Sequence, residues 1–321
     1  MKNFSYSVAI RTLGKAGDKY LKTLQSCASQ TIKPTNIYVY IPYDYDLPKE
    51  TIGTEIYIRC EKGMIVQRAQ KYEQIKDDWI LFLDDDVYLP NNFVERNWNF
   101  FQESNADCIT PDFYEHYKNS NKTKLLGIIL NGVIPIKSTK WSFIILPYGR
   151  FAYNLNPQNT FMQSQTNCGA CCLCRKNAYE KIKFWDEKWF DEFAYALGDD
   201  QLFHYKLHIK NFKLYTFFNS GAIHLDAGSK NRKMDGNQIK KNAACMYLIW
   251  YRSIYKLSSN SVFKKLYLGF CFFIYALSQL VFSNIYILKK VYTAPIATLS
   301  GYYMGWKFCQ SKQYRKYPLF H

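Results

Sequence analysis

The N-terminal part of the chain alternates short apolar stretches with helical ones, and this alternation restricts the folds open to it. We predict strands over Tyr6–Ile10, Asn36–Ile41 and Glu55–Arg59, and helices over Tyr20–Ser29 and Ile65–Ile75. Strands and helices in this order are typical of a mostly parallel sheet with helices on both faces. Ligands of such sheets bind beyond the carboxyl ends of the strands, so a functional site is expected there.

The strongest predicted strand, Trp79–Leu83, runs directly into an acid triplet, Asp84, Asp85 and Asp86. Adjacent carboxylates repel one another and stay ionised together only when a cation lies among them. Mg²⁺ and Mn²⁺ prefer oxygen ligands of this kind and often share them with phosphate groups. The triplet therefore suggests a metal site at the end of this strand, with a solvated acidic turn as the alternative.

The charge of the chain is concentrated at its C-terminal end. The net charge is +16, and residues 229–321 contribute 15 Lys and Arg against one acid, Asp235. A basic segment of this kind can bind nucleic acid or an anionic membrane, where each basic side chain contributes about 1 kcal/mol. We divide the chain into a folded domain, residues 1–228, and a basic, apolar, helical segment, residues 229–321.

An uncharged run, Leu266–Leu288, favours a membrane over nucleic acid as the partner of this segment. Lys264–Lys265 and Lys289–Lys290 flank it. The run is long enough to cross a bilayer, but equal basic flanks give no orientation. A helix lying in the membrane surface and an ordinary buried helix are the alternatives. Because no secretory signal opens the chain, we expect peripheral or single-helix association with the cytoplasmic face of the cell membrane.

Four of the ten cysteines lie close together, at Cys168, Cys171, Cys172 and Cys174. Their spacing is not that of a disulfide framework, which fits a reducing compartment. We predict a strand here with Cys172 and Cys174 on one face, and a zinc site is the alternative.

Taken in order, several elements resemble the family 2 glycosyltransferases. Trp79–Asp86 is similar to the family's central strand and its Asp-x-Asp motif. The other matching elements are Val8–Thr12, Gln30–Pro34, Gly63–Arg68, Trp185–Trp189 and the acid pair Asp199 and Asp200 that follows Gly198. The resemblance covers about residues 5–228 and depends on order and spacing as well as on single motifs.

This resemblance implies an α/β fold: a Rossmann-like nucleotide-sugar-binding domain of the glycosyltransferase A type with a mostly parallel central sheet, followed by a C-terminal helical segment. It implies metal-dependent, inverting transfer of a sugar, with Mg²⁺ or Mn²⁺ as cofactor. Asp200 would be the general base, and Asp199 would orient it or bind the acceptor. The implied donor contacts are Thr12, Arg68, Asp84 and Asp85, and the implied metal ligands are Asp84, Asp86 and His224.

Simpler interpretations exist for two of these residues. A single histidine beside an apolar strand, such as His224, is often structural, and an arginine on a helix, such as Arg68, is usually solvated. The chain also departs from the family where the second strand ends in Val39–Pro42 instead of an acidic pair. Asp44 and Asp46 lie nearby but too late in the sequence, so the nucleotide base stays open among uridine, thymidine and guanosine.

We expect a nucleoside-diphosphate sugar donor, a glycan or lipid-linked acceptor and an anionic membrane surface as partners, in surface polysaccharide or glycolipid synthesis. A basic, aromatic-rich nucleic-acid-binding protein is one alternative. The basic excess lies beside an uncharged run instead of on the folded domain, so no nucleic acid is expected. A catalytically inactive relative is the other alternative, but the acid triplet and Asp200 are both present.

Overall fold

The computed structural model describes residues 4–114, 134–193, 198–225, 235–258, 261–288 and 290–320. The strands are β1 (Tyr6–Arg11), β2 (Ile37–Pro42), β3 (Glu55–Cys60), β4 (Trp79–Asp84), β5 (Val87–Tyr88), β6 (Cys108–Pro111), β7 (Ile134–Ile136), β8 (Trp141–Ile145), β9 (Phe151–Asn154), β10 (Phe161–Ser164), β11 (Cys171–Arg175), β12 (Leu214–Phe217) and β13 (Ile223–His224). The helices are α1 (Asp18–Ala28), α2 (Met64–Arg68), α3 (Phe93–Ser104), α5 (Lys176–Ile182), α6 (Asp199–Ile209), α7 (Gly236–Trp250), α8 (Val262–Leu288) and α9 (Ala294–Cys309), with 3-10 helices η3 (Phe184–Phe193) and η6 (Tyr314–Lys316) and a π-helical turn η5 (Tyr251–Tyr255).

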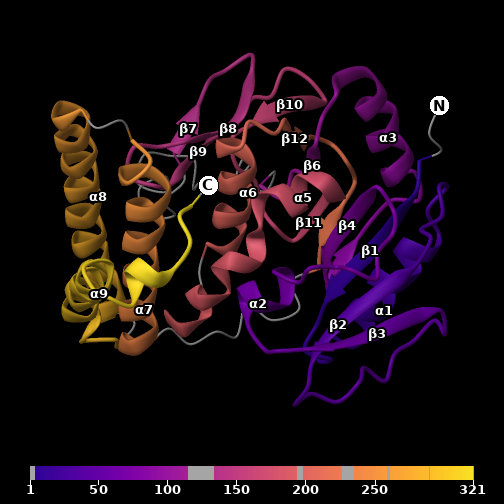
Figure 1. Ribbon diagram of the computed structural model, residues 1–321, viewed down its shortest axis with the longest axis horizontal. Helices are drawn as coiled ribbons and strands as arrows, with labels where there is room; N and C mark the ends of the chain where they lie inside the picture. Colours follow the sequence, from indigo (N-terminus) through magenta and orange to yellow (C-terminus); the bar gives the residue numbers. More distant parts are fainter. Residues whose placement is uncertain are drawn as a thin grey trace.

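Eleven of the described strands form one sheet in the order β3-β2-β1-β4-β11-β6-β12-β10-β8-β9-β7 (Figure 1). The first four are parallel, and β11 runs antiparallel beside β4. Parallel pairs outnumber antiparallel ones, so the predicted α/β class with a mostly parallel sheet is confirmed. In the register of β1 and β4, Arg11 lies opposite Asp84, and Leu83 lies opposite Cys171 of β11.

The sheet is buried on both faces, and alternate side chains of β4 belong to the hydrophobic clusters on the two faces. Trp79, Leu81 and Leu83 pack with α1 and α3, whereas Ile80 and Phe82 pack with α5, α6 and α7. This alternation is the two-residue period of a strand. The cysteine-rich strand is also confirmed as β11, which divides its side chains between the same two clusters. Cys172 and Cys174 are on the α6 face, and Cys171 is on the other.

The strands predicted over the first 83 residues are confirmed to within about a residue, but the helix predicted over Ile65–Ile75 is too long. Helix α2 ends at Arg68. The carbonyl oxygen of Arg68 accepts hydroxyl hydrogen bonds from Tyr72, at 2.9 Å, and Tyr179, at 3.0 Å. Tyr72, four residues beyond the helix, has a positive φ of 53°, and its side chain is buried in the core. Tertiary packing therefore overrides the local helical pattern.

The C-terminal helices divide into an inner and an outer part. Helix α7 packs in the core with Leu248 and Ile249, and Arg252 of η5 donates to Glu187 of η3 at 3.0 Å. Helices α8 and α9 lie at the far end of the molecule from β1–β3 (Figure 1). The predicted boundary between residues 228 and 229 lies outside the described residues, so this division of the chain stays a prediction.

Candidate active site

The acid triplet meets a histidine from a distant part of the sequence. Strand β5 pairs with β13, which places His224 opposite Val87. Nε2 of His224 lies 3.1 Å from Oδ1 of Asp86, and the backbone N–H of Leu225 donates to the Asp86 carbonyl at 2.7 Å. Ligand atoms of Asp84, Asp86 and His224 all lie within 4.8 Å of one another.

These three side chains suit a hard divalent cation. Two carboxylates and a neutral imidazole are a donor set that Mn²⁺ or Mg²⁺ accepts, and Asp84 and Asp86 emerge from the same strand end. These residues suit a metal because carboxylate oxygens from the end of β4 and an imidazole nitrogen from β13 converge on one place. Thus the residues predicted as metal ligands are brought together by the fold.

Asp85, the middle residue of the triplet, points away from this group. Its Oδ2 accepts a hydrogen bond of 2.5 Å from the hydroxyl of Thr12, which in turn accepts one of 2.8 Å from the backbone N–H of Gly14. Burial raises the pKa of Asp85 to about 6, the charges of Asp84 and Asp86 add to this, and the bond from Thr12 opposes it. Asp85 and Thr12 therefore form one unit at the carboxyl ends of β4 and β1.

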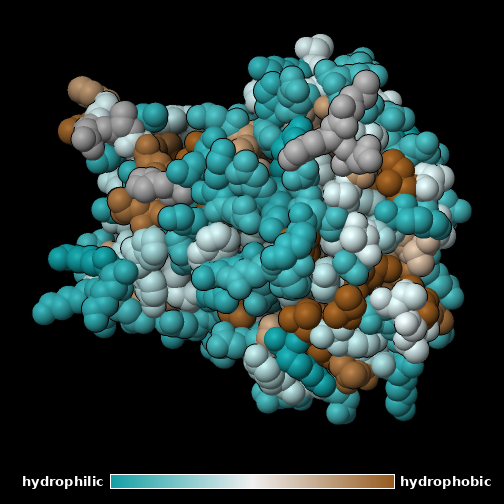
Figure 2. Space-filling view, turned by 45° about the vertical axis from the view of Figure 1, so that its right-hand side comes forward, coloured by the Kyte–Doolittle hydropathy of each residue, from teal (hydrophilic) through white to brown (hydrophobic). Residues whose placement is uncertain are grey.

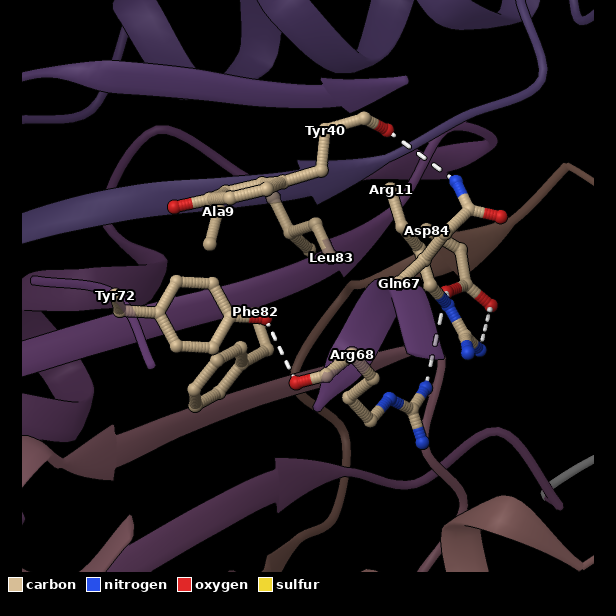
Figure 3. Close-up of a pocket in the computed structure, with 9 residues that line it drawn as sticks. All are labelled: Ala9, Arg11, Tyr40, Gln67, Arg68, Tyr72, Phe82, Leu83 and Asp84. Carbon is tan, nitrogen blue, oxygen red and sulfur yellow. Dashed lines mark hydrogen bonds and ion pairs between the residues drawn. The ribbon is translucent and has the colours of Figure 1, made fainter. Parts of the chain in front are cut away.

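Two arginines join the acid triplet to the acid pair. Arg68 is buried, not solvated, and its Nη1 lies 2.5 Å from Oδ1 of Asp200 and 3.1 Å from Oδ2 of Asp199. Nη1 of Arg11 lies 2.8 Å from the same oxygen of Asp199, and its Nε contacts Asp84. Figure 3 shows both guanidinium groups directed at Asp84. The result is a continuous network of charges across the ends of β1, β4 and α6.

The acid pair occupies the first turn of α6, directly after Gly198. Gly198 has a φ of 104°, and an added Cβ would lie 2.5 Å from Cδ1 of Ile249 in α7. Burial and the charge of Asp200 raise the pKa of Asp199. Burial alone would raise the pKa of Asp200 too, but the charges of Arg68 and Arg11 outweigh it and hold that pKa below its usual value. Asp200 is therefore the more acidic carboxylate of the pair.

Gly169, in the turn before β11, is a site residue that the sequence did not reveal. Its carbonyl oxygen accepts a 2.5 Å hydrogen bond from Nη2 of Arg68. A Cβ at this position would lie 1.8 Å from Oδ1 of Asp200 and 2.4 Å from Nη1 of Arg68. No larger residue fits without moving one of these groups.

Arg11 and Asp191 were also missed. Arg11 directly follows the predicted strand Tyr6–Ile10, at the edge where ligands of such sheets bind, and that position could have identified it. Asp191 of η3 accepts hydrogen bonds from the backbone N–H groups of Ile65, at 3.0 Å, and Val66, at 2.8 Å. It thereby fixes the first turn of α2, the helix that carries Arg68.

A small cavity adjoins the network. It is lined by Ala9, Arg11, Tyr40, Gln67, Arg68, Tyr72, Phe82, Leu83 and Asp84 (Figure 3). Its volume of about 10 Å³ holds about one water molecule. Nε2 of Gln67 donates to the carbonyl oxygens of Thr12, at 3.0 Å, and Tyr40, at 3.3 Å, which ties the ends of β1 and β2 together. The side chains of Asp44 and Asp46, the two acids that follow the second strand, are exposed to solvent.

A second group of potential ligands lies in the core below α6. Ligand atoms of Cys108, Cys172 and His204 lie within 4.8 Å of one another, and all three residues are buried. Burial raises the pKa of the Cys172 thiol well above its usual value, and a hydrogen bond with Cys108 adds to this. Burial also lowers the pKa of His204 to about 4. Cys108 and Cys172 also belong to the hydrophobic core on the α6 face of the sheet.

Comparison with known proteins gives one family match. The model described as glycosyl transferase family 2 matches residues 21–183, half of the chain, a range that includes Arg68, Gly169 and the acid triplet. No curated protein matches. Among solved structures, the chain is similar to one described as GalNAc-T7 with UDP, GalNAc and Mn²⁺, at 12% identity and a TM-score of 0.49. That match covers 81% of this chain and 52% of the other, so this chain spans about half of that one's length.

Proposed function

Because the chain belongs to glycosyl transferase family 2, we propose that it moves a sugar from a nucleoside-diphosphate donor to a hydroxyl of a glycan or lipid-linked acceptor. The observation that carries the proposal is the meeting of the acid triplet and the acid pair, which are more than 100 residues apart in the sequence. Arg11 bridges them by contacting both Asp84 and Asp199. A transferase needs these two acidic groups side by side, one for the donor and one for the acceptor.

The donor side of the proposed site comprises the ends of β1 and β4. Asp84, Asp86 and His224 would hold Mg²⁺ or Mn²⁺, which when bound neutralises the negative charge of the departing diphosphate. Thr12 and Asp85 form a hydrogen-bonded unit that can accept from ribose or base groups of the donor. Arg68 supplies a planar guanidinium that suits phosphate oxygens.

On the acceptor side, Asp200 is the proposed general base. It takes the proton of the acceptor hydroxyl while the hydroxyl oxygen forms a bond to the anomeric carbon of the sugar. The bond from that carbon to the diphosphate oxygen breaks, and its electron pair leaves with the nucleoside diphosphate. Direct attack from the opposite face inverts the anomeric configuration. Asp199, held by Arg11, orients Asp200 or binds the acceptor.

Arg68 links the two sides. It contacts Asp200 directly and holds its pKa low, which keeps the carboxylate ionised but makes it a weak base. A diphosphate competes for the same guanidinium. A diphosphate bound to this guanidinium would share its positive charge, so the pKa of Asp200 would rise and the carboxylate would become a better proton acceptor. The base is thereby strengthened when a donor is present.

Residues 229–321 are proposed to associate with the cytoplasmic face of the cell membrane. The segment has 15 Lys and Arg and one acid. Among the described residues, α8 is the one helix long and apolar enough to cross a membrane by length and composition. A membrane location suits a lipid-linked or growing surface glycan as acceptor, in polysaccharide or glycolipid synthesis.

A binding measurement tests the donor side. The melting temperature of the native chain is measured with a panel of nucleoside diphosphates, with and without Mn²⁺ or Mg²⁺. We expect one diphosphate to raise it, with the metal present, and we expect Asp86→Asn and His224→Gln to abolish the rise. His208→Gln, which changes a partly buried histidine two turns along α6, should keep it. Failure of every diphosphate to stabilise the native chain would contradict the proposal.

A further inference from the structure

Helix α8 has two distinct faces. Its inner face packs against the protein through Leu268, Phe272 and Ser283. Its outer face is apolar but exposed, and Phe263 and Leu288, near its two ends, are each 85% exposed. The exposed side chains recur at intervals of three or four residues, with two adjacent pairs, at Phe263, Leu266, Tyr267, Phe270, Phe273, Ile274, Leu277, Val281, Ile285 and Leu288. They form one stripe along the side of the helix that points away from the protein.

Helix α9 repeats this arrangement. Its inner face is made of small residues that let it approach α7 closely. An added Cβ at Gly301 would lie 2.2 Å from the carbonyl oxygen of Lys240, and one at Gly305 would lie 2.9 Å from that of Ala244. Its outer face exposes Ile296, Leu299, Tyr303 and Trp306, again at intervals of three and four residues.

The two stripes together form what we call the apolar platform, the exposed residues of α8 and α9 named above. In Figure 2, apolar residues show in the upper part of the left-hand edge and hydrophilic ones below them, on the side of the molecule where α8 and α9 lie in Figure 1. Exposed apolar side chains on a soluble surface are usually scattered singly. A set of this size on two helices that pack against each other marks an interaction surface.

The charges around the platform indicate its partner. The exposed lysines Lys264 and Lys290 lie at the two ends of α8, and Lys307 and Lys312 lie at the end of α9. The platform also includes Tyr267, Tyr303 and Trp306, which suit the boundary between headgroups and acyl chains. Apolar residues bordered by lysines and aromatics match an anionic phospholipid leaflet.

The contacts of the inner face disfavour a crossing orientation for α8. Tyr275, the middle residue of this 27-residue helix, stacks on Tyr148 with ring centroids 4.9 Å apart. Tyr148 belongs to the turn between β8 and β9, which also contains Arg150 and is bonded to α7 by Trp250 at 3.1 Å. If α8 crossed a bilayer, this turn would lie at its midplane. Irregular backbone and an arginine are strongly disfavoured there.

We propose that α8 and α9 seat the enzyme in one leaflet of an anionic membrane through the apolar platform, with α8 lying along the surface and not across it. About 40 Å of α8 would then face lipid along one side, while the other side stays on the protein. Both ends of α8 are on the same side of the membrane. The inference rests on the surface of α8 and α9 and holds whether or not the proposed sugar transfer is correct.

Vesicle binding tests the partner. The full chain is sedimented with phosphatidylglycerol–phosphatidylcholine vesicles and with phosphatidylcholine vesicles alone. We expect tighter binding to the anionic vesicles, at least tenfold weaker binding for Phe270→Glu on α8 and for Leu299→Glu on α9, and no change for Ile56→Glu on β3. Ile56 is a matched control because it is also an exposed large apolar residue, and it lies far from the platform. Melting temperatures check that each variant is folded.

Equal binding of the two platform variants and the native chain would overturn the proposal. A second result would also overturn it. If analytical ultracentrifugation showed that the native chain is a dimer, and Phe270→Glu and Leu299→Glu made it a monomer without changing vesicle binding, the platform would join two copies of the chain.

Labelling from one side of the membrane tests the orientation. Cysteines are introduced at Ser261 and Tyr292, exposed positions just beyond the two ends of α8. Sealed vesicles carrying the chain are treated with a membrane-impermeant maleimide, and the unmodified chain gives the background from its own ten cysteines. We expect both positions to react to the same extent before lysis. Reaction of one position only until the vesicles are lysed would show that α8 crosses the membrane and would overturn the proposal.

Discussion

Arg68 contacts Asp200 and Gly169 simultaneously, with its Nη1 2.5 Å from Oδ1 of Asp200 and its Nη2 2.5 Å from the Gly169 carbonyl oxygen. The side chain is buried, and these two contacts hold the guanidinium between the turn before β11 and the first turn of α6. The protonation of the proposed base is therefore linked to an arginine from a helix 132 residues earlier in the chain.

Replacing Arg68 tests this link. Arg68 holds the pKa of Asp200 below its usual value, so in Arg68→Met that pKa rises and Asp200 takes up a proton at higher pH. The acidic limb of the kcat/KM profile should move to higher pH by about 1 to 3 units. Arg175→Met, at the other end of β11, should leave the limb in place. An unshifted limb in Arg68→Met would show that Asp200 is not the group that titrates.

Gly169 should tolerate no side chain. In Gly169→Ala the new methyl group would overlap Asp200 and Arg68, which must then move by about 1 Å or more. A displacement of that size costs about 100-fold in rate at a catalytic group, so we expect that loss in kcat/KM. Gly269→Ala is the matched control, since a Cβ there meets nothing within 4 Å. Equal activity of the two variants would contradict the proposed geometry.

Asp85 should reduce stability at neutral pH. Its pKa is about 6 in the folded chain and about 3.9 in an unfolded one. A carboxyl whose pKa is higher in the folded state stabilises the fold fully only at a pH below its pKa in the unfolded chain. That stabilisation is lost as the pH rises through the folded-state pKa of about 6. In the absence of metal, Asp85→Asn should therefore stabilise the chain by about 1 to 3 kcal/mol at pH 7.5 and by almost nothing near pH 4. Urea unfolding at the two pH values measures both. A gain that is the same at pH 4 and pH 7.5 would rule out this explanation.

Glu187 should be essential for stability. It is fully buried and accepts from Lys206 at 2.7 Å and from Arg252 at 3.0 Å, which joins η3 to α6 and to the C-terminal helices. Glu187→Gln leaves two buried cations without their carboxylate, which costs about 3 to 5 kcal/mol. Glu180→Gln, which removes an exposed partner of Lys176, should cost less than about 1 kcal/mol. Chemical denaturation of the two variants compares these values.

The sequence was most informative where local pattern and tertiary structure agree. Strand β4 is an apolar run that stays buried on both faces, so its bounds and the acid triplet after it follow from residue order. Helix α2 is different, because its end depends on hydrogen bonds from Tyr72 and Tyr179 to Arg68, and Tyr179 is more than 100 residues away. No local pattern encodes that contact.

The candidate site shows the same limit. The acids Asp84, Asp86, Asp199 and Asp200 were identified from motifs, but their connection through Arg11 depends on the register of β1 beside β4. The role of Gly169 depends on the space left between Asp200 and Arg68. Register and close approach are properties of the folded chain, so these residues could be recognised only in three dimensions.

The most direct measurement is the rate of sugar transfer by the native chain and by Asp200→Asn, with Mn²⁺ or Mg²⁺, using the nucleotide-sugar that binds. We predict metal-dependent transfer by the native chain. Asp200→Asn should bind donor and metal at least as tightly but transfer at least about 100-fold more slowly, because it lacks the base. Transfer by Asp200→Asn at the native rate, or no transfer by a native chain that is folded and saturated with donor, metal and a panel of acceptors, would contradict this mechanism.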